Sequence, residues 1–194
     1  MLAAHQLSAA RAKATKTLGD AVTAAMQDLS MAGGRFVVAL NECEAAAYGL
    51  EQVEFLVAGH AGTAPRPLAK VASGGELARI SLAISVITSS ATATPTLIFD
   101  EVDSGIGGGV AEVVGRLLRR LGQDRQVLCV THLPQVASQA NQHFEVSKTS
   151  RDGKTLSRID ALDAKDRVEE IARMLGGIEI TATSRKHARE LLAL

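Results

Sequence analysis

The stretch Thr96-Leu97-Ile98-Phe99-Asp100-Glu101 decides how this chain folds. It is a short apolar run that stops at two adjacent carboxylates. A run of this kind is typical of a strand buried in a parallel sheet. Ligands of open α/β sheets bind at the carboxyl ends of the strands, where both carboxylates lie. The stretch therefore predicts an α/β fold with an acidic site at one edge of the sheet.

The segments around this strand alternate between helical and extended patterns. A helix is expected from Glu76 to about Ser89, before the strand, and another from Gly109 to Leu121, after it. Gln126–Thr131 reads as a second buried strand, and a helix is expected after Pro134, because proline suits the first turn of a helix. This alternation indicates a mostly parallel sheet flanked by helices.

The first 32 residues are expected to form a separate unit. Their apolar residues recur at spacings of three and four, which predicts a long helix with one narrow apolar stripe, as in a coiled-coil arm. Gly33-Gly34 is expected to end this helix, so that residues 33–194 form the second unit. The stripe consists of Leu7, Ala10, Ala14, Leu18, Val22, Ala25 and Leu29.

Further elements are expected on both sides of the central alternation. Phe36–Leu40 and Val53–Val57 are candidate strands. Towards the end of the chain, two strands around Val146 and Ile159 flank Asp152-Gly153, a dipeptide typical of hairpin turns. Two helices, Ala164–Leu175 and Thr183–Leu192, follow.

Composition excludes several classes of protein. The 194 residues carry 21 basic and 21 acidic side chains, so the overall charge of a strongly basic nucleic-acid binder is absent. Cys43 and Cys129 are far apart and form no CxxC pair, which argues against a disulfide scaffold or zinc ribbon and favours a reducing, cytosolic setting. The start of the chain lacks the apolar core of a signal peptide. Serines, threonines and Pro95 interrupt the longest apolar stretch, so no membrane span is expected.

Ser73-Gly74-Gly75-Glu76 stands immediately before a predicted helix. Glycines let a ligand approach the backbone closely, and a helix N-terminus offers free N–H groups and the positive end of the helix dipole. Ser73 adds a hydroxyl donor. The motif predicts a phosphate cradle, and the alternative is an ordinary capped helix start.

The two carboxylates suit complementary tasks. Asp100 is placed to hold Mg²⁺ through water, and Glu101 to orient or deprotonate an attacking water. Asp103 adds a third carboxylate. His132 follows the second buried strand, where it is positioned to donate to a phosphate. The alternatives are solvated acids at a strand end and a structural histidine. Cys129 is interpreted as a small core residue.

The order of these motifs resembles the C-terminal part of an ABC-type ATPase head, with SGGE as the signature loop, IFDE as the Walker B strand and His132 as the switch histidine. Longer stretches resemble the RecN family of bacterial, SMC-like ATPases over nearly the whole chain. They are RPLAKVASGGEL (66–77), DEVDSGIGG (100–108), THLPQVA (131–137), RMLGG (173–177) and HARELL (187–192).

The resemblance implies ATP and Mg²⁺ as cofactors and a role in DNA double-strand break repair and recombination in the bacterial cytoplasm, at the nucleoid. Ser73, Gly74, Gly75 and Glu76 would then contact ATP bound to a second, opposing head. Asp100 would support Mg²⁺, Glu101 would activate the hydrolytic water and His132 would contact the γ-phosphate. Losing one such preorganised group costs about 10²–10³-fold in rate. Transporter-type ATPases carry an aspartate where this chain has Gly107, so that residue's interface role is not carried over.

The phosphate-binding motif GxxxxGK[ST] does not occur in this sequence. In RecN-like proteins it lies in an N-terminal segment, beyond a coiled-coil hairpin. The chain is therefore expected to be the C-terminal half of a split ATPase head, inactive without the P-loop half. The alternatives are a non-catalytic dimerisation module of another SMC-like or ABC ATPase, and a metal-dependent phosphoesterase using Asp100, Glu101, Asp103 and His132.

DNA binding is implied by the family alone. The densest basic group is interpreted as a solvated helix face, and it consists of Arg116, Arg119, Arg120 and Arg125. The expected partners are thus the P-loop half, a second head and DNA, with no membrane.

Overall fold

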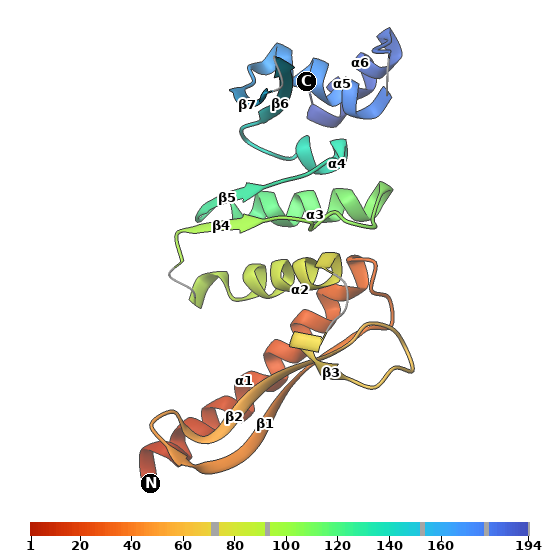
Figure 1. The fold of residues 1–194 in the computed structure, drawn as a ribbon. Coiled ribbons are helices and arrows are strands. Elements are labelled where there is room, and N and C mark those ends of the chain that lie inside the picture. The colour runs from red at the N-terminus through yellow and green to blue at the C-terminus, as the bar shows by residue number, and fades with distance from the viewer. Residues whose placement is uncertain (71–73, 92–93, 152–153, 177–178, 194) are drawn as a thin grey trace.

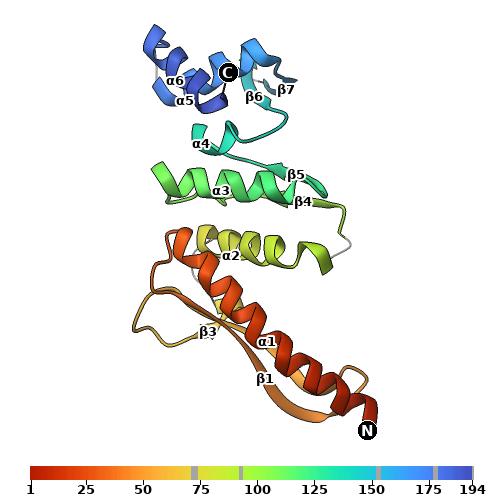
Figure 2. The same cartoon turned by 180° about the vertical axis from the view of Figure 1, so that it is seen from behind.

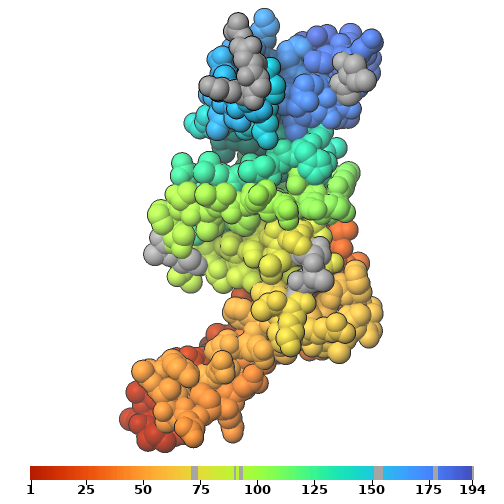
Figure 3. Space-filling model, viewed as in Figure 1, coloured from red at the N-terminus to blue at the C-terminus, as the bar shows by residue number. Residues whose placement is uncertain are grey.

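The computed structural model describes residues 1–70, 74–91, 94–151, 154–176 and 179–193. The molecule is elongated (Figures 1 and 2). A long N-terminal helix and a β-hairpin lie at one end, and the last two helices lie at the other. The central strands and their helices lie between these ends, as the space-filling view also shows (Figure 3).

The N-terminal end is built from helix α1 (Leu2–Asp28) and the antiparallel strands β1 (Arg35–Ala46) and β2 (Gly49–Ala58). Arg11 of α1 donates to the carbonyl of Tyr48 at 2.8 Å and pairs with Glu51 at 3.3 Å, which ties the helix to the hairpin. The predicted helix is present, and it lies along a hairpin much longer than the two predicted strands.

Helix α1 ends at Asp28, before the predicted Gly33-Gly34. The chain turns at Ser30, which has a left-handed φ of 64°. The Gln27 amide then accepts from the N–H of Gly33 at 2.8 Å and donates to the carbonyl of Gly34 at 3.0 Å. These bonds close the turn, because a side chain of the last helical turn satisfies the backbone groups that follow it.

The centre of the molecule consists of two parallel strands and their helices. Strand β4 (Thr96–Phe99) pairs in parallel with β5 (Gln126–Cys129), with Phe99 opposite Cys129. Helix α2 (Gly74–Ile87) precedes β4, and α3 (Gly108–Leu121) connects the two strands. The predicted α/β centre is confirmed. Helix α4, expected after Pro134, is a single turn, Pro134–Ala137.

The remaining sheets are antiparallel. Strand β3 (Arg66–Pro67) extends the β1–β2 pair, and β6 (Phe144–Arg151) pairs with β7 (Lys154–Ala161). Among the described strands, the expected parallel pairing is therefore confirmed only for β4–β5. The other strand pairs are joined by short connections, which can link only antiparallel strands. The predicted turn residues Asp152-Gly153 lie outside the described residues.

The C-terminal end is formed by α5 (Ala164–Gly176) and α6 (Ala182–Leu192). Thr181 and Ser184 form a capping box at the start of α6. Short 3-10 turns occupy Leu68–Lys70 and Ser89–Ala91.

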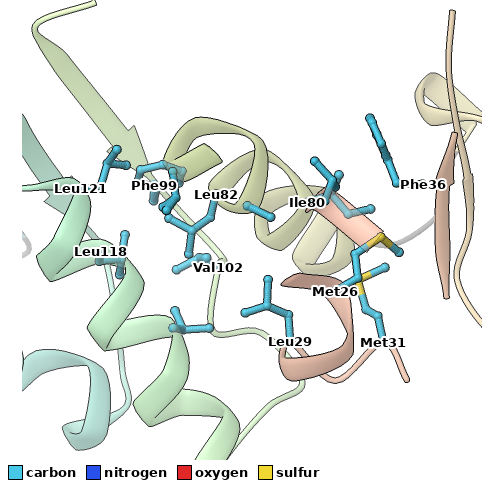
Figure 4. Packing of buried hydrophobic residues seen from close by; sticks show 14 of the residues in the cluster. Met26, Leu29, Met31, Phe36, Ile80, Leu82, Phe99, Val102, Leu118 and Leu121 are labelled. Carbon is cyan, nitrogen blue, oxygen red and sulfur yellow. The ribbon is translucent and has the colours of Figure 1, made fainter. Parts of the chain in front are cut away.

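Buried residues gather in two clusters. The larger cluster joins α1, α2, α3 and β4, and Figure 4 shows Met26, Leu29, Ile80 and Leu82 facing Phe99, Val102, Leu118 and Leu121. The smaller cluster joins α5 and α6 through Ile171 and Ala188. Helix α4 links them, since Val136 belongs to the first cluster and Ala137 to the second.

One face of the β4–β5 pair remains bare. Leu97 and Val127 pack against the larger cluster, whereas Ile98 and Val130 are 69% and 63% exposed. Parallel sheets are normally covered on both faces. The β6–β7 hairpin also exposes large apolar side chains, namely Phe144, Val146, Leu156 and Ile159. Both surfaces are therefore apolar areas that the described residues leave uncovered.

Among the described helices, none has both the length and the apolar character that crossing a membrane requires.

Candidate nucleotide site

The candidate site lies where β4 and β5 end. Strand β4 ends at Phe99 and is followed by Asp100 and Glu101, and β5 ends at Cys129, three residues before His132. The N–H of Val130 donates to the carbonyl of Phe99 at 3.0 Å, which keeps the two strand ends level. The sequence-based expectation that the carboxylates and the histidine share one sheet edge is met by this pairing.

The backbone turns sharply at the carboxylates. Glu101 has a left-handed φ of 57°, a conformation that non-glycine residues adopt rarely. Asp100 Oδ1 accepts from the Glu101 N–H at 2.9 Å, and the Glu101 carbonyl accepts from the Ser104 N–H at 3.0 Å. Both carboxylate residues are exposed. The turn thus presents two adjacent acids to solvent.

The glycines of the SGGE motif lie against this turn. Helix α2 begins at Gly74, and a Cβ added there would lie 2.5 Å from Oε2 of Glu101. A Cβ on the buried Gly75 would lie 2.9 Å from the carbonyl oxygen of Ser104. At Gly75 the neighbour is a backbone carbonyl, so this close approach requires glycine, whereas at Gly74 the neighbour is the end of a flexible side chain. Glu76 lies in the first turn of α2, and Ser73 lies outside the described residues.

Arg79 is a residue that the sequence reasoning missed. It is buried, and its Nη1 donates to the Ser104 carbonyl at 2.8 Å. Burial lowers the pKa of Arg79, and the charge of Glu76 partly opposes this effect. The sequence offered one signal for its position. Arg79 follows Gly75 by four residues, which places both residues on the same face of the predicted helix. Arg79 thus holds helix α2 against the turn that follows Asp100 and Glu101.

Asp103 does not lie beside the other two carboxylates as a third exposed acid. Its side chain is 4% exposed, and its Oδ2 accepts from the Thr131 hydroxyl at 2.5 Å and from the His132 N–H at 3.1 Å. The His132 ring is largely exposed, with Nδ1 3.3 Å from the same oxygen. Thr131, to which the sequence reasoning gave no role, also accepts from the Leu133 N–H at 3.1 Å.

A magnesium ion fits the site only with help from other ligands. Within the described residues, no three His, Cys, Asp or Glu side chains form a metal-binding group. Asp100 is exposed, and its Oδ1 is already bonded to a backbone N–H. Mg²⁺ in nucleotide sites usually keeps several waters and takes one or two carboxylates plus phosphate oxygens. Asp100 suits that water-mediated role, and a metal-dependent phosphoesterase would need more ligands than these residues supply.

An open groove of about 390 Å³ lies between α2 and β4. Leu77, Ala78, Leu97, Ile98 and Phe99 supply most of its lining, and Gly74 and Asp100 mark the end that meets the site. Its apolar lining suits the packing of protein side chains better than a triphosphate. The groove therefore belongs to the uncovered side of the sheet.

The reactivity of Cys129 tests the environment in which the structure places this thiol, on the face of β5 that packs against the larger cluster. Burial, together with the nearby charges of Asp103 and Asp100, raises the pKa of this thiol to about 12. The thiolate is the reactive form, so almost none is present at pH 8.5. We expect iodoacetamide to label Cys43 under native conditions and Cys129 only after unfolding in urea, as followed by mass spectrometry. Equal native labelling of both thiols would contradict this environment.

The basic group on and after α3 is partly used within the fold. Arg116 pairs with Glu112, and Arg125 Nη2 donates to the Ser89 carbonyl at 2.6 Å. Arg119 and Arg120 are exposed. These contacts agree with the interpretation of a solvated helix face and assign no ligand to it.

Comparison with protein-family models finds no match for this chain, whereas comparison with individual proteins finds close relatives. DNA repair protein RecN of Xylella fastidiosa (strain 9a5c) is 48% identical over 193 residues, which is 98% of this chain and 35% of that protein. The chain thus spans about a third of the length of this relative.

Solved structures show the same fold at lower identity. An SMC head domain with a coiled coil and joint from Pyrococcus yayanosii superposes with a TM-score of 0.60 at 22% identity, over 80% of this chain and 28% of that one. A chain from a study of ATP-driven dimerization and DNA stimulated activation of SMC ATPases gives 0.54 at 18% identity, over 86% of this chain and 96% of that one. Over nearly its whole length the chain is therefore similar to part of DNA repair protein RecN, and it has the fold of an SMC head domain.

Proposed function

We propose that this chain is the C-terminal half of an ATP-hydrolysing head that acts in DNA double-strand break repair and recombination. One observation carries the proposal. The start of α2, the Asp100–Glu101 pair and His132 come from three separate segments and converge at the edge where β4 and β5 end. That convergence suits phosphoryl transfer, in which catalysis is mainly positioning and electrostatic stabilisation.

Each group has a distinct role in this proposal. Gly74 and Gly75, with Ser73 and Glu76, would bind the γ-phosphate of ATP held by a second head, through the N-terminal end of α2. Glu101 would take a proton from the attacking water. His132 would donate to the γ-phosphate. Asp100 would hold Mg²⁺ through water, and this ion would neutralise developing charge on the phosphates.

The uncovered surfaces support a missing half as partner. β4 and β5 each pair with one strand among the described residues, and Ile98 and Val130 face solvent. Burying apolar area contributes about 25 cal/mol per Å², so a complementary segment would bind here with a substantial gain. A P-loop segment that adds strands to this sheet would also supply the GxxxxGK[ST] motif that the sequence lacks.

The N-terminal helix fits the same proposal. Val22 and Met26, near the C-terminal end of α1, are buried in the main cluster, whereas Leu2 and Leu7 near its start are exposed. We assign residues 1–32 as the root of a coiled-coil arm, anchored on the head at its C-terminal end. DNA and a second copy of the head complete the expected partners, by analogy with the RecN relative named for DNA repair.

The test of this function is ATP turnover by the chain mixed with a RecN segment that carries the P-loop. We expect magnesium-dependent hydrolysis in the mixture and none with either part alone. The reason is that the phosphate cradle and the catalytic carboxylate lie on different segments.

A further inference from the structure

Asp103 occupies a different place from the two acids beside it. Its carboxylate is buried against the loop formed by residues 131–133, although Asp103 follows the exposed Glu101 by only two residues. Three groups of the next loop approach one oxygen, Oδ2. They are the Thr131 hydroxyl at 2.5 Å, the His132 N–H at 3.1 Å and the His132 ring Nδ1 at 3.3 Å.

These contacts restrain the backbone of residues 131–133 as well as the His132 ring. Thr131 donates to Asp103 and accepts from the Leu133 N–H, so the backbone on both sides of His132 is held. The His132 side chain itself is 72% exposed, so few other contacts restrain it. Hydrogen bonds to ionised groups are about twice as strong as neutral ones. Among the contacts of the described residues, the approach of Nδ1 to this carboxylate is the one that bears directly on the orientation of the imidazole.

The orientation has a chemical consequence. The two ring nitrogens lie on different sides of the imidazole, and which one carries the proton depends on the partner of the other. With Nδ1 against Oδ2 of Asp103, Nε2 is the ring nitrogen on the opposite side of the imidazole from this carboxylate. A buried carboxylate that holds an imidazole in this way sets its tautomer and orientation.

We propose that Asp103 is a positioning residue that directs Nδ1–H of His132 toward its own carboxylate and Nε2 toward the phosphate, with Thr131 holding the carboxylate in place. The phosphate end of this proposal rests on the ATPase function proposed above. Donation from Nε2 to a bound phosphate requires a ring that carries a proton on each nitrogen, with Nδ1–H directed at Asp103.

The orientation can be tested without ATP. In the ¹⁵N-histidine-labelled chain, the neutral ring of His132 should be the Nδ1–H tautomer, seen in long-range ¹H–¹⁵N spectra. Asp103→Ala removes the acceptor, so the preference for Nδ1–H should be lost and the Nε2–H tautomer should appear. A wild-type ring that is already Nε2–H, or a tautomer that Asp103→Ala leaves unchanged, would overturn the proposal.

Turnover in the mixture with the P-loop segment provides the second readout. Asp103→Asn should lower kcat about 10–100-fold, as second-layer carboxylates behind functional histidines do, with little change in KM for ATP. The control Asp124→Asn removes an exposed carboxylate after α3 and should leave kcat unchanged. In a His132→Ala background, Asp103→Asn should have almost no further effect, because the two residues act as a unit.

A second pair of variants covers the case in which Asp103→Asn does not fold. Thr131→Val removes the donor to Asp103 at nearly constant shape and should lower kcat in the same direction, whereas Thr131→Ser keeps the hydroxyl and should restore it. Equal turnover of Thr131→Val and Thr131→Ser would overturn the proposal. An inactive wild-type mixture would instead contradict the ATPase function, and the tautomer measurement then decides the role of Asp103 separately.

Discussion

Replacing Glu101 with glutamine should stop ATP hydrolysis and leave ATP binding intact. The amide has the shape of the carboxylate and cannot accept a proton from water. General-base catalysis contributes about 10²–10⁴-fold, so turnover of the reconstituted head should fall by about that factor. Glu101 is exposed at the strand end and has a left-handed backbone, which glutamine adopts as readily as glutamate, so the fold should not change.

The measurement is steady-state hydrolysis together with equilibrium ATP binding in the mixture with the P-loop segment. Glu44→Gln makes the same chemical change on the exposed part of β1 and should behave as wild type. Since binding precedes hydrolysis, the Glu101→Gln head should accumulate with ATP bound. A Glu101→Gln head that still hydrolyses ATP at the wild-type rate would show that another group activates the water.

Replacing Gly75 with alanine should disable the head by moving α2 relative to the carboxylate turn. The added methyl group would lie 2.9 Å from the Ser104 carbonyl oxygen and 3.1 Å from Arg79 Nη1. Both neighbours are fixed, because Arg79 is buried and bonded to that carbonyl. Inserting a methyl group into such a packed site costs about 1–3 kcal/mol. A displacement of about 1 Å in a catalytic arrangement can lower the rate about 10²-fold.

Gly109→Ala is the matched control for this change. A Cβ at Gly109 meets no atom within 4 Å, and alanine favours the helical conformation of α3. We expect Gly109→Ala to keep full turnover, and Gly75→Ala to lose about two orders of magnitude of it. Equal turnover by the two variants would mean that the contact between α2 and the turn is not needed for catalysis.

The central strands were predictable because their signal is local. The apolar run Thr96–Phe99 has the same bounds in the sequence prediction and in the structure, and its parallel pairing with Gln126–Cys129 follows the alternation of helix and strand. Helices α2 and α3 begin within two residues of their predicted starts for the same reason. The edge position of Asp100, Glu101 and His132 followed from this topology.

The contacts that organise the site were not predictable from local pattern. Thr131 and Asp103 are 28 residues apart in sequence, and Arg79 and Ser104 are 25 apart, so no periodicity relates either pair. A carboxylate two residues after Glu101 reads as another exposed acid, and only the fold shows that it is buried.

The long β1–β2 hairpin escaped prediction for a different reason. Its outer part, around Glu42 and Glu44, is exposed and polar, so it lacks the apolar alternation of a buried strand. Helix α1 holds that part of the hairpin through Arg11, a contact between segments 40 residues apart.

ATP turnover by the two separate segments tests the central claim most directly. The chain, a P-loop segment of a RecN relative and their mixture are each assayed with ATP and Mg²⁺. A mixture with Ile98→Asp in this chain is the control, because a charge on the bare sheet face should prevent assembly. We predict hydrolysis in the wild-type mixture only. Turnover by this chain alone, or an inactive mixture in which the two segments have formed a stable complex, would contradict the account.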